Sequence, residues 1–153
     1  MINGGTVTAQ GGAGGAGIGT GATYYSTNKC SDITINGGAV TATGGMYGAG
    51  IGTGYADGST STNECGAITI GTGVTSVTAK KSSSNSGPNI IGVGYDFGGT
   101  QTCGTITFGT AAVFDGSAWS PATMVADTYG GLTLAISTTT NANDTWTLTP
   151  VAP

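Results

Sequence analysis

The chain has 153 residues, which fits one domain, and 31 of them are glycine. Only 7% of the residues are charged, and three lysines without any arginine stand against seven carboxylates, for a formal net charge of −4. We therefore expect no nucleic-acid partner, and no stretch approaches the ~20 apolar residues of a membrane-spanning helix. The chain has no histidine, the commonest general base and metal ligand, so we expect no metal and no cofactor.

The first predicted element, M-I-N-G-G, returns three times along the chain with small changes. It reads I-T-I-N-G-G at 33–38, I-T-I-G-T-G at 68–73 and I-T-F-G-T at 106–110. Ile2, Ile35, Ile70 and Phe108 then share one column of the repeat, at spacings of 33, 35 and 38 residues. A period of this length is typical of repeat architectures, in which neighbouring repeats stack.

The next element, V-T-A, alternates apolar and polar residues as a strand does. Its valines form a second column, which consists of Val7, Val40, Val77 and Val113. Each repeat is predicted to contain three short strands and a closing polar loop. This pattern predicts an all-β fold, a parallel β-solenoid (β-helix) of about three coils over residues 1–114. The repeat boundaries are approximately 1–34, 35–69 and 70–107, with a partial repeat at 108–114. A β-propeller or β-sandwich is the competing architecture, but its strands are longer.

The third predicted strand is G-A-G-I-G-T-G, at 15–21 and again at 48–54, with P-N-I-I-G-V-G at 88–94. Glycine in a strand marks a place where a ligand or another backbone approaches closely. Three explanations are open for this glycine face. The tail or a crossing loop packs on it, the segment is sharply curved, or the face is a docking surface for a glycan or a partner chain.

Tyrosines and carboxylates follow the glycine segments. Stacked rings beside hydrogen-bond acceptors suit a sugar, because a ring face accepts C–H groups while polar side chains orient hydroxyls. The alternative is that the tyrosines only hold the loops down. The predicted ligand-binding residues are Tyr24, Tyr55, Asp57, Tyr95 and Asp96.

Each repeat carries one cysteine three residues before its I-T-I or I-T-F, at Cys30, Cys65 and Cys103. Equivalent positions in adjacent coils lie within the Cα separation that a disulfide permits. Three cysteines allow one disulfide at most, and the alternative is a column of buried free thiols. They lack the paired spacing of a zinc site.

The repeat ends after Val113. Residues 115–127 are expected to be irregular, and the alternating segments 131–137 and 144–150 are predicted to form a β-hairpin through T-T-T-N-A-N at 138–143. We expect residues 115–153 to cap the last coil, because a solenoid end exposes apolar edges. The chain begins inside a strand, so we expect it to be the end piece of a longer array, with an uncapped N-terminal coil open to end-to-end contacts. The apolar residues available to the cap are Trp119, Leu132, Leu134, Ile136, Trp146 and Leu148.

The repeat C-[GS]-x-I-T-[IF]-x-G-x-V-T-A-x-G-G…G-A-G-I-G-T-G resembles the glycine- and threonine-rich repeats of large secreted or surface-anchored proteins of gut bacteria. The likeness covers residues 1–114, and the tail resembles the ends of such proteins. The glycine runs are also similar to those of phage tail-fibre adhesins. The resemblance implies an extracellular or cell-surface adhesin that interacts with a matrix, and it carries no functional residues over to this chain.

The sequence is compatible with three candidate functions. The first is a non-catalytic surface module that binds glycans or other surfaces. The second is ice binding, because outward threonine ladders at Thr8, Thr41 and Thr78, and at Thr34, Thr69 and Thr107, suit ordered water. The third is a polysaccharide-acting β-helix enzyme, which needs a basic residue or clustered carboxylates. The carboxylates of this chain are scattered, so the first function is preferred.

Overall fold

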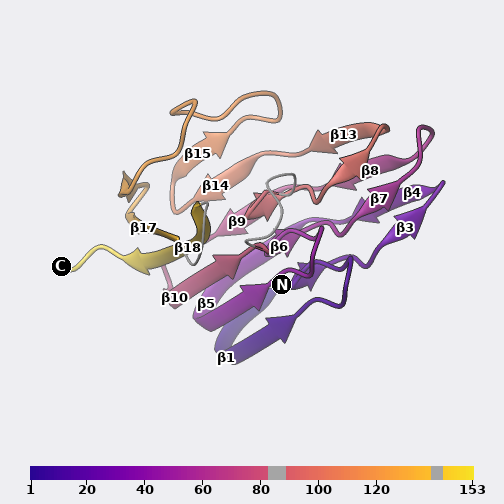
Figure 1. The fold of residues 1–153 in the computed structure, drawn as a ribbon. Helices are drawn as coiled ribbons and strands as arrows, with labels where there is room; N and C mark the ends of the chain where they lie inside the picture. Colours follow the sequence, from indigo (N-terminus) through magenta and orange to yellow (C-terminus); the bar gives the residue numbers. More distant parts are fainter. Residues whose placement is uncertain (83–88, 139–142) are drawn as a thin grey trace.

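The computed structural model describes residues 1–82, 89–138 and 143–153, and every regular element in them is a β-strand. One nine-stranded sheet holds most of the core, and three small parallel sheets continue the same repeats (Figure 1). The large sheet consists of β1 (Ile2–Gln10), β5 (Ile33–Thr43), β9 (Ile68–Ile70), β10 (Val74–Lys80), β14 (Ile106–Phe108), β15 (Ala111–Phe114), β16 (Asp127–Tyr129), β17 (Leu132–Thr138) and β18 (Asn143–Pro150). The small sheets are β2 (Ile18–Gly19), β6 (Ile51–Gly52) and β11 (Ile91–Gly92); β3 (Thr23–Tyr24), β7 (Ala56–Asp57) and β12 (Asp96–Phe97); and β4 (Thr27–Cys30), β8 (Thr62–Cys65) and β13 (Thr100–Cys103).

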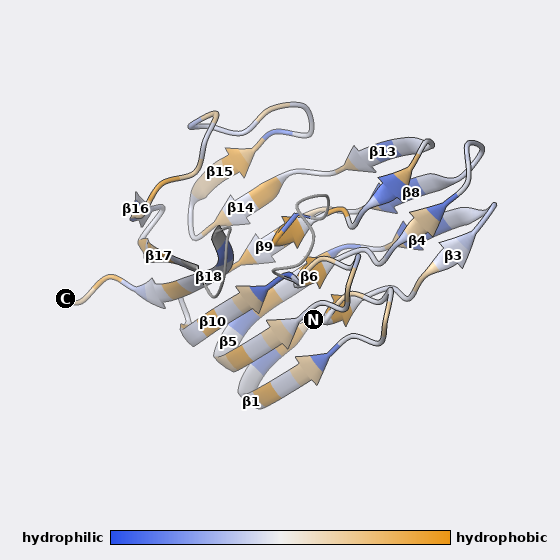
Figure 2. Cartoon of the chain, in the orientation of Figure 1, coloured by the Kyte–Doolittle hydropathy of each residue, from blue (hydrophilic) through white to orange (hydrophobic). Residues whose placement is uncertain are grey.

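The predicted isoleucine column is present. In the parallel ladders Ile2 pairs with Ile35, Ile35 with Ile70, and Ile70 with Phe108. Ile35, Ile70 and Phe108 are fully buried, and burying such a side chain stabilises the fold by roughly 1.5–3 kcal/mol. Thr34, between two inward isoleucines, is half-buried and not fully exposed as the alternation predicts. Figure 2 shows apolar stripes crossing β1, β5 and β10.

The valine column contains three of the four predicted residues. Val7, Val40 and Val77 pair in register, but Val113 does not follow them. Gly109 has φ +56°, and after this turn β15 runs back antiparallel to β14. Leu148 of β18 takes the place beside Val77, in an antiparallel pair. The large sheet therefore mixes parallel and antiparallel strands, and a simple three-coil solenoid does not describe it.

A fourth parallel ladder was predicted as a polar loop. It joins β4, β8 and β13, with Asn28 opposite Asn63 and Asn63 opposite Gln101. Asn28 and Asn63 are buried although they are polar, which is why no apolar alternation marks these strands. The Asn63 Nδ2 donates to the carbonyl oxygens of Gly54 (3.0 Å) and Gly94 (3.4 Å), so the amide ties this ladder to the glycine segment.

At most of their glycines the glycine segments lie against the backbone of the neighbouring repeat. Only two residues of each segment are in a strand, and the chain bends around them: the Ala16 N–H donates to the Thr20 carbonyl oxygen at 2.9 Å. A Cβ on Gly54 would overlap the Gly21 carbonyl oxygen, and one on Gly94 would overlap that of Gly54. Of the three explanations, sharp curvature is the one that this geometry matches.

Threonine hydroxyls lock the stacked bends together. The Gly54 N–H donates to Thr20 Oγ1 (3.1 Å), and the Gly94 N–H donates to Thr53 Oγ1 (2.8 Å). The equivalent residue in the last repeat is Val93, which has no hydroxyl. A threonine is therefore present at this position in each repeat whose bend carries another repeat on top of it.

The tail covers the end of the large sheet. β17 and β18 form the predicted antiparallel hairpin, and its connecting residues 139–142 lie outside the described part of the chain. Trp146 is buried, with its ring edge-on to Phe108 at 6.2 Å between centroids, and Trp119 lies 5.6 Å from Trp146. Leu132, Leu134 and Leu148 join the same core cluster. The short strand β16 was not predicted.

Two glycines at the same position of the repeat give a matched test of the stacking constraint. We expect Gly54→Ala to destabilise the fold by about 3 kcal/mol or more, because the added Cβ meets two backbone carbonyl oxygens that cannot move aside. Gly21→Ala should change the free energy of unfolding by less than about 1 kcal/mol, because nothing lies within 4 Å of its Cβ. Urea unfolding measures both. Equal destabilisation by the two substitutions would contradict this account.

Candidate ligand-binding site

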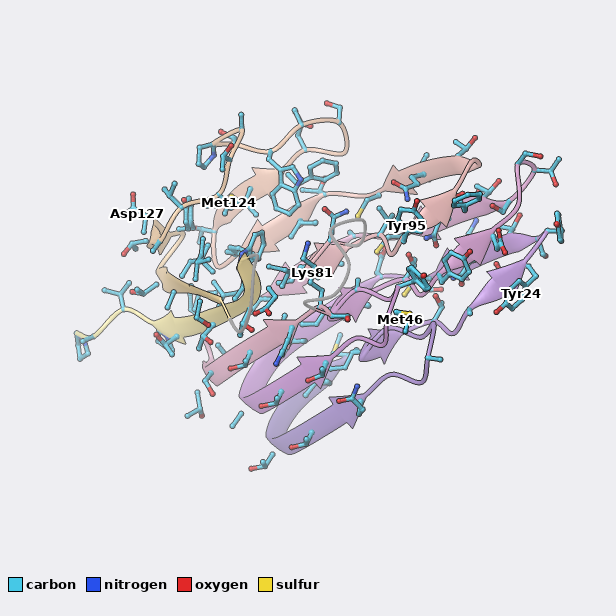
Figure 3. The ribbon with its side chains drawn as sticks, in the orientation of Figure 1. Tyr24, Met46, Lys81, Tyr95, Met124 and Asp127 are labelled. Carbon is cyan, nitrogen blue, oxygen red and sulfur yellow. The ribbon has the colours of Figure 1, made fainter. Side chains whose placement is uncertain are left out.

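The tyrosines that follow the glycine bends form one surface. The Ala56 N–H donates to the Tyr95 carbonyl oxygen (3.0 Å), so the second and third repeats align there, and the rings of Tyr55 and Tyr95 stack at 6.2 Å with an angle of 10° between their planes. Tyr24 of β3 packs edge-on against Tyr55 at 6.2 Å. Figure 3 shows Tyr24 and Tyr95 on the side of the molecule away from the tail residues Met124 and Asp127.

Tyr47 belongs to this surface although sequence reasoning missed it. Its ring lies 4.9 Å from that of Tyr55 and 5.7 Å from that of Tyr95. Its carbonyl oxygen accepts the Tyr95 N–H (2.9 Å), as the Gly14 carbonyl accepts the Tyr55 N–H in the repeat before (2.7 Å). Tyr47 stands one repeat after Gly14 in the G-G-x-x-G turn, so aligning these turns could have placed it beside the tyrosine column.

Strand alternation separates the two predicted carboxylates. Tyr24, Asp57 and Phe97 are partners in the ladder of β3, β7 and β12, whereas Asp96 pairs with Ala56 in the adjacent column. Successive residues of a strand face opposite sides. Asp57 therefore lies on the same side as the Tyr55 and Tyr95 rings, and Asp96 on the other.

Asp96 holds a turn instead of joining the tyrosines. Its Oδ1 accepts hydrogen bonds from the Gly99 N–H (2.7 Å) and the Ser61 hydroxyl (3.2 Å), and its Oδ2 is buried. Asp96 lines neither of the two hollows described below. Asp96 is therefore turned away from the tyrosine rings with which the sequence grouped it.

Tyr25 occupies a conformation in which the other repeats use glycine. Its φ is +53°, and the following repeats have Gly58 (φ +114°) and Gly98 (φ +94°) at the same place. Left-handed backbone is uncommon for a residue with a bulky side chain. The Tyr25 ring lies directly over Gly58, where a Cβ would come within 2.5 Å of its Cδ1. Gly58 thus leaves the space that the ring fills.

Two shallow hollows meet on this surface. One is lined by Tyr25, Asp57, Gly58, Ser59, Tyr95, Phe97 and Gly98. The other is lined by Tyr47, Tyr55, Asp57, Tyr95 and Phe97. Asp57, Tyr95 and Phe97 are common to both, and we call the combined depression the aromatic groove. It offers ring faces, the carboxylate of Asp57, the phenol groups of its four tyrosines and the hydroxyl of Ser59 to a ligand.

The carboxylate of Asp57 and the phenol of Tyr55 interact. Partial desolvation raises the pKa of the Tyr55 phenol, and the negative charge of Asp57, with a side-chain hydrogen bond between the two groups, raises it further. The phenol therefore stays protonated at neutral pH beside the carboxylate. Asp57 keeps further acceptor sites, because an ionised carboxylate has about four lone-pair positions.

The cysteines form the predicted column, away from the aromatic groove. Cys30 pairs with Cys65 and Cys65 with Cys103 in the ladder of β4, β8 and β13, and all three are free thiols in this structure. Hydrogen bonds with both neighbours, together with burial, raise the pKa of the Cys65 thiol. The bond with Cys65 lowers the pKa of Cys30 and of Cys103. The described residues contain no group of three histidine, cysteine or carboxylate side chains placed to hold a metal ion.

A family model of the beta helix repeat matches residues 1–22 and 33–55. The match covers the first two bends and the strands before them, and it agrees with the parallel ladders. The match supports a β-helix repeat in these residues. No curated protein and no solved structure matches the chain significantly. The described residues include no helix with the length and apolar character needed to span a membrane.

The thiol column predicts an order of alkylation. We expect iodoacetamide to label Cys103 first, because it is half-exposed and its pKa is lowered, and Cys65 last, because it is buried with a raised pKa. Mass spectrometry of peptides after timed labelling measures the order. In urea the three rates should become similar. Faster labelling of Cys65 than of Cys103 in the folded protein would contradict the assignment.

Proposed function

We propose that this protein is a non-catalytic, extracellular or cell-surface module that binds glycans through the aromatic groove. The observation that carries the proposal is the stack of Tyr47, Tyr55 and Tyr95 beside a carboxylate. Tyr24, Tyr25 and Phe97 border it and are 65%, 75% and 61% exposed. Exposed aromatic side chains gathered on one face are a mark of interaction sites.

The chemistry of the groove suits a saccharide. The apolar faces of a sugar ring can lie on the tyrosine rings, while hydroxyl groups donate to Asp57 and to Ser59. The groove is shallow, so we expect weak binding by a single module. Repetition of such modules along one chain would raise the affinity through effective concentration.

The finer architecture and the setting belong to the same proposal. In this proposal residues 1–114 are three stacked solenoid coils, apart from the reversed strand β15, and residues 115–153 are their cap. The whole is an adhesin-like protein similar to the glycine- and threonine-rich surface proteins of gut bacteria. β1 has one partner among the described strands, β5. Its other edge is suited to end-to-end contacts with a further coil, since an unpaired strand edge is a template for pairing.

Removing the stacked rings tests the function. We expect the double variant Tyr55→Ala, Tyr95→Ala to lose at least tenfold in glycan affinity, because both ring faces of the groove disappear. Its melting temperature should fall by no more than about 5 °C, since both side chains are only half-buried. A glycan array followed by calorimetry on the ligands found gives the affinities.

Val125→Ala is the matched control, because Val125 is an exposed apolar residue of the tail. It should bind as the wild type does. Full binding by the folded double variant would place the site elsewhere. A collapse of the melting temperature would show that the tyrosines stabilise the loops and do not serve a ligand.

Ice binding is the second candidate, favoured by one outward column of threonines. Thr8, Thr41, Thr78 and Thr147 are in register across β1, β5, β10 and β18, and the hydroxyls of Thr78 and Thr147 lie 3.4 Å apart. If this surface binds ice, the protein should show thermal hysteresis, and Thr41→Tyr should reduce it by blocking the flat face. No hysteresis at millimolar protein removes this candidate.

A further inference from the structure

The aromatic groove carries a single charged side chain, and that charge is negative. Asp57 is the one carboxylate among the residues that line both hollows, and no lysine lines either. The lysines are placed elsewhere: Lys29 pairs with Glu64 at 3.1 Å, and Lys80 and Lys81 lie where β10 meets β18. The whole chain has a net charge of −4, so the groove lies in a field that attracts cations.

The rings around Asp57 add to this preference. Asp57 faces its ladder partners Tyr24 and Phe97, while Tyr25 and Tyr95 line the same hollow. The face of an aromatic ring is electron-rich and attracts an organic ammonium group, most strongly where several rings surround it. A carboxylate together with several ring faces is complementary to a protonated amine.

We infer that the aromatic groove selects saccharides that carry a protonated amine, that is, amino sugars without an N-acetyl group, over neutral and acidic saccharides. The inference rests on the proposed glycan-binding function and names its ligand class. The ammonium group pairs with Asp57 and lies against the rings of Tyr25 and Phe97, while the rest of the sugar ring rests on Tyr95. A uronic acid would bring its carboxylate against Asp57 and be repelled.

The conformation of Tyr25 supports a role for its ring in this selection. Gly58 and Gly98 hold the same left-handed position without strain, whereas Tyr25 carries a bulky side chain there. Its ring is 75% exposed and contributes little to the core, but it forms one wall of the groove above Asp57. Strain that persists although the ring contributes little to the core points to function.

Three oligosaccharides of equal length separate the possibilities: a pentamer of glucosamine, a pentamer of N-acetylglucosamine and a pentamer of galacturonic acid. By isothermal calorimetry at low salt and pH 6, we expect the amine to bind about tenfold more tightly than the N-acetylated form, which matches one partly exposed charge pair plus ring contacts. The acid should bind most weakly. Added salt should reduce the preference.

Two variants test the residues. Asp57→Asn keeps the shape of the side chain and should bring the affinities for the amine and the N-acetylated form to within about twofold. Tyr25→Gly restores the residue that the other repeats use, so the protein should be at least as stable, yet its affinity for the amine should fall several-fold. Circular dichroism confirms that each variant is folded.

The outcomes distinguish selection of amino sugars from glycan binding in general. Equal binding of the amine and the N-acetylated form by the wild type, or an unchanged preference in Asp57→Asn, overturns the inference and leaves glycan binding in place. Binding of neutral glycans on an array with none of the glucosamine pentamer does the same. If no saccharide binds at all, the proposed function fails together with the inference.

Discussion

Stacked backbones about 4.8 Å apart decide what each position of this chain can hold. A side chain that points into the stack meets its own equivalent above and below, so isoleucines pack against isoleucines, as Ile35 does against Ile70. One that points outward has free space. At the bends, a Cβ would point along the stack and strike the next backbone, as it would at Gly54, and only glycine is accommodated there.

The same spacing builds the aromatic groove. Tyrosines at equivalent positions of adjacent repeats arrive with parallel rings, which is the arrangement of Tyr55 and Tyr95. Because successive residues of a strand face opposite sides, a shift of one residue changes a carboxylate's role: Asp57 lies among the rings, while Asp96 is engaged with Ser61 and Gly99. Strand alternation thus places one carboxylate, that of Asp57, in the groove and gives the groove its negative charge.

At the end of the repeat, residues of the tail make the contacts that a further repeat would make. Trp146 covers the apolar end near Phe108, and Leu148 pairs beside Val77 where a fourth valine would otherwise stand. An antiparallel strand can provide this cover because apolar and polar residues alternate along β18 as they do along the strands of the repeat. The last bend has Val93 where the first two have Thr20 and Thr53, whose hydroxyls bond the next repeat. A valine fits this position because no further repeat stacks on the last bend.

The sequence by itself determined the repeat, the all-β class, the isoleucine and cysteine columns and the tail hairpin, because each depends on periodicity that is written along the chain. It also indicated Tyr24, Tyr55, Tyr95 and Asp57 as neighbours. Only the tertiary structure decided the rest. The ladder through Asn28 and Asn63 is held by amide hydrogen bonds, which leave no apolar pattern. Tyr47 lies in the groove although it belongs to a turn, and strand alternation places Asp96 outside the groove. The chain also reverses at Gly109, so that β15 is antiparallel to β14. Each of these depends on the direction of a side chain or of the backbone in space, which the order of residues does not specify.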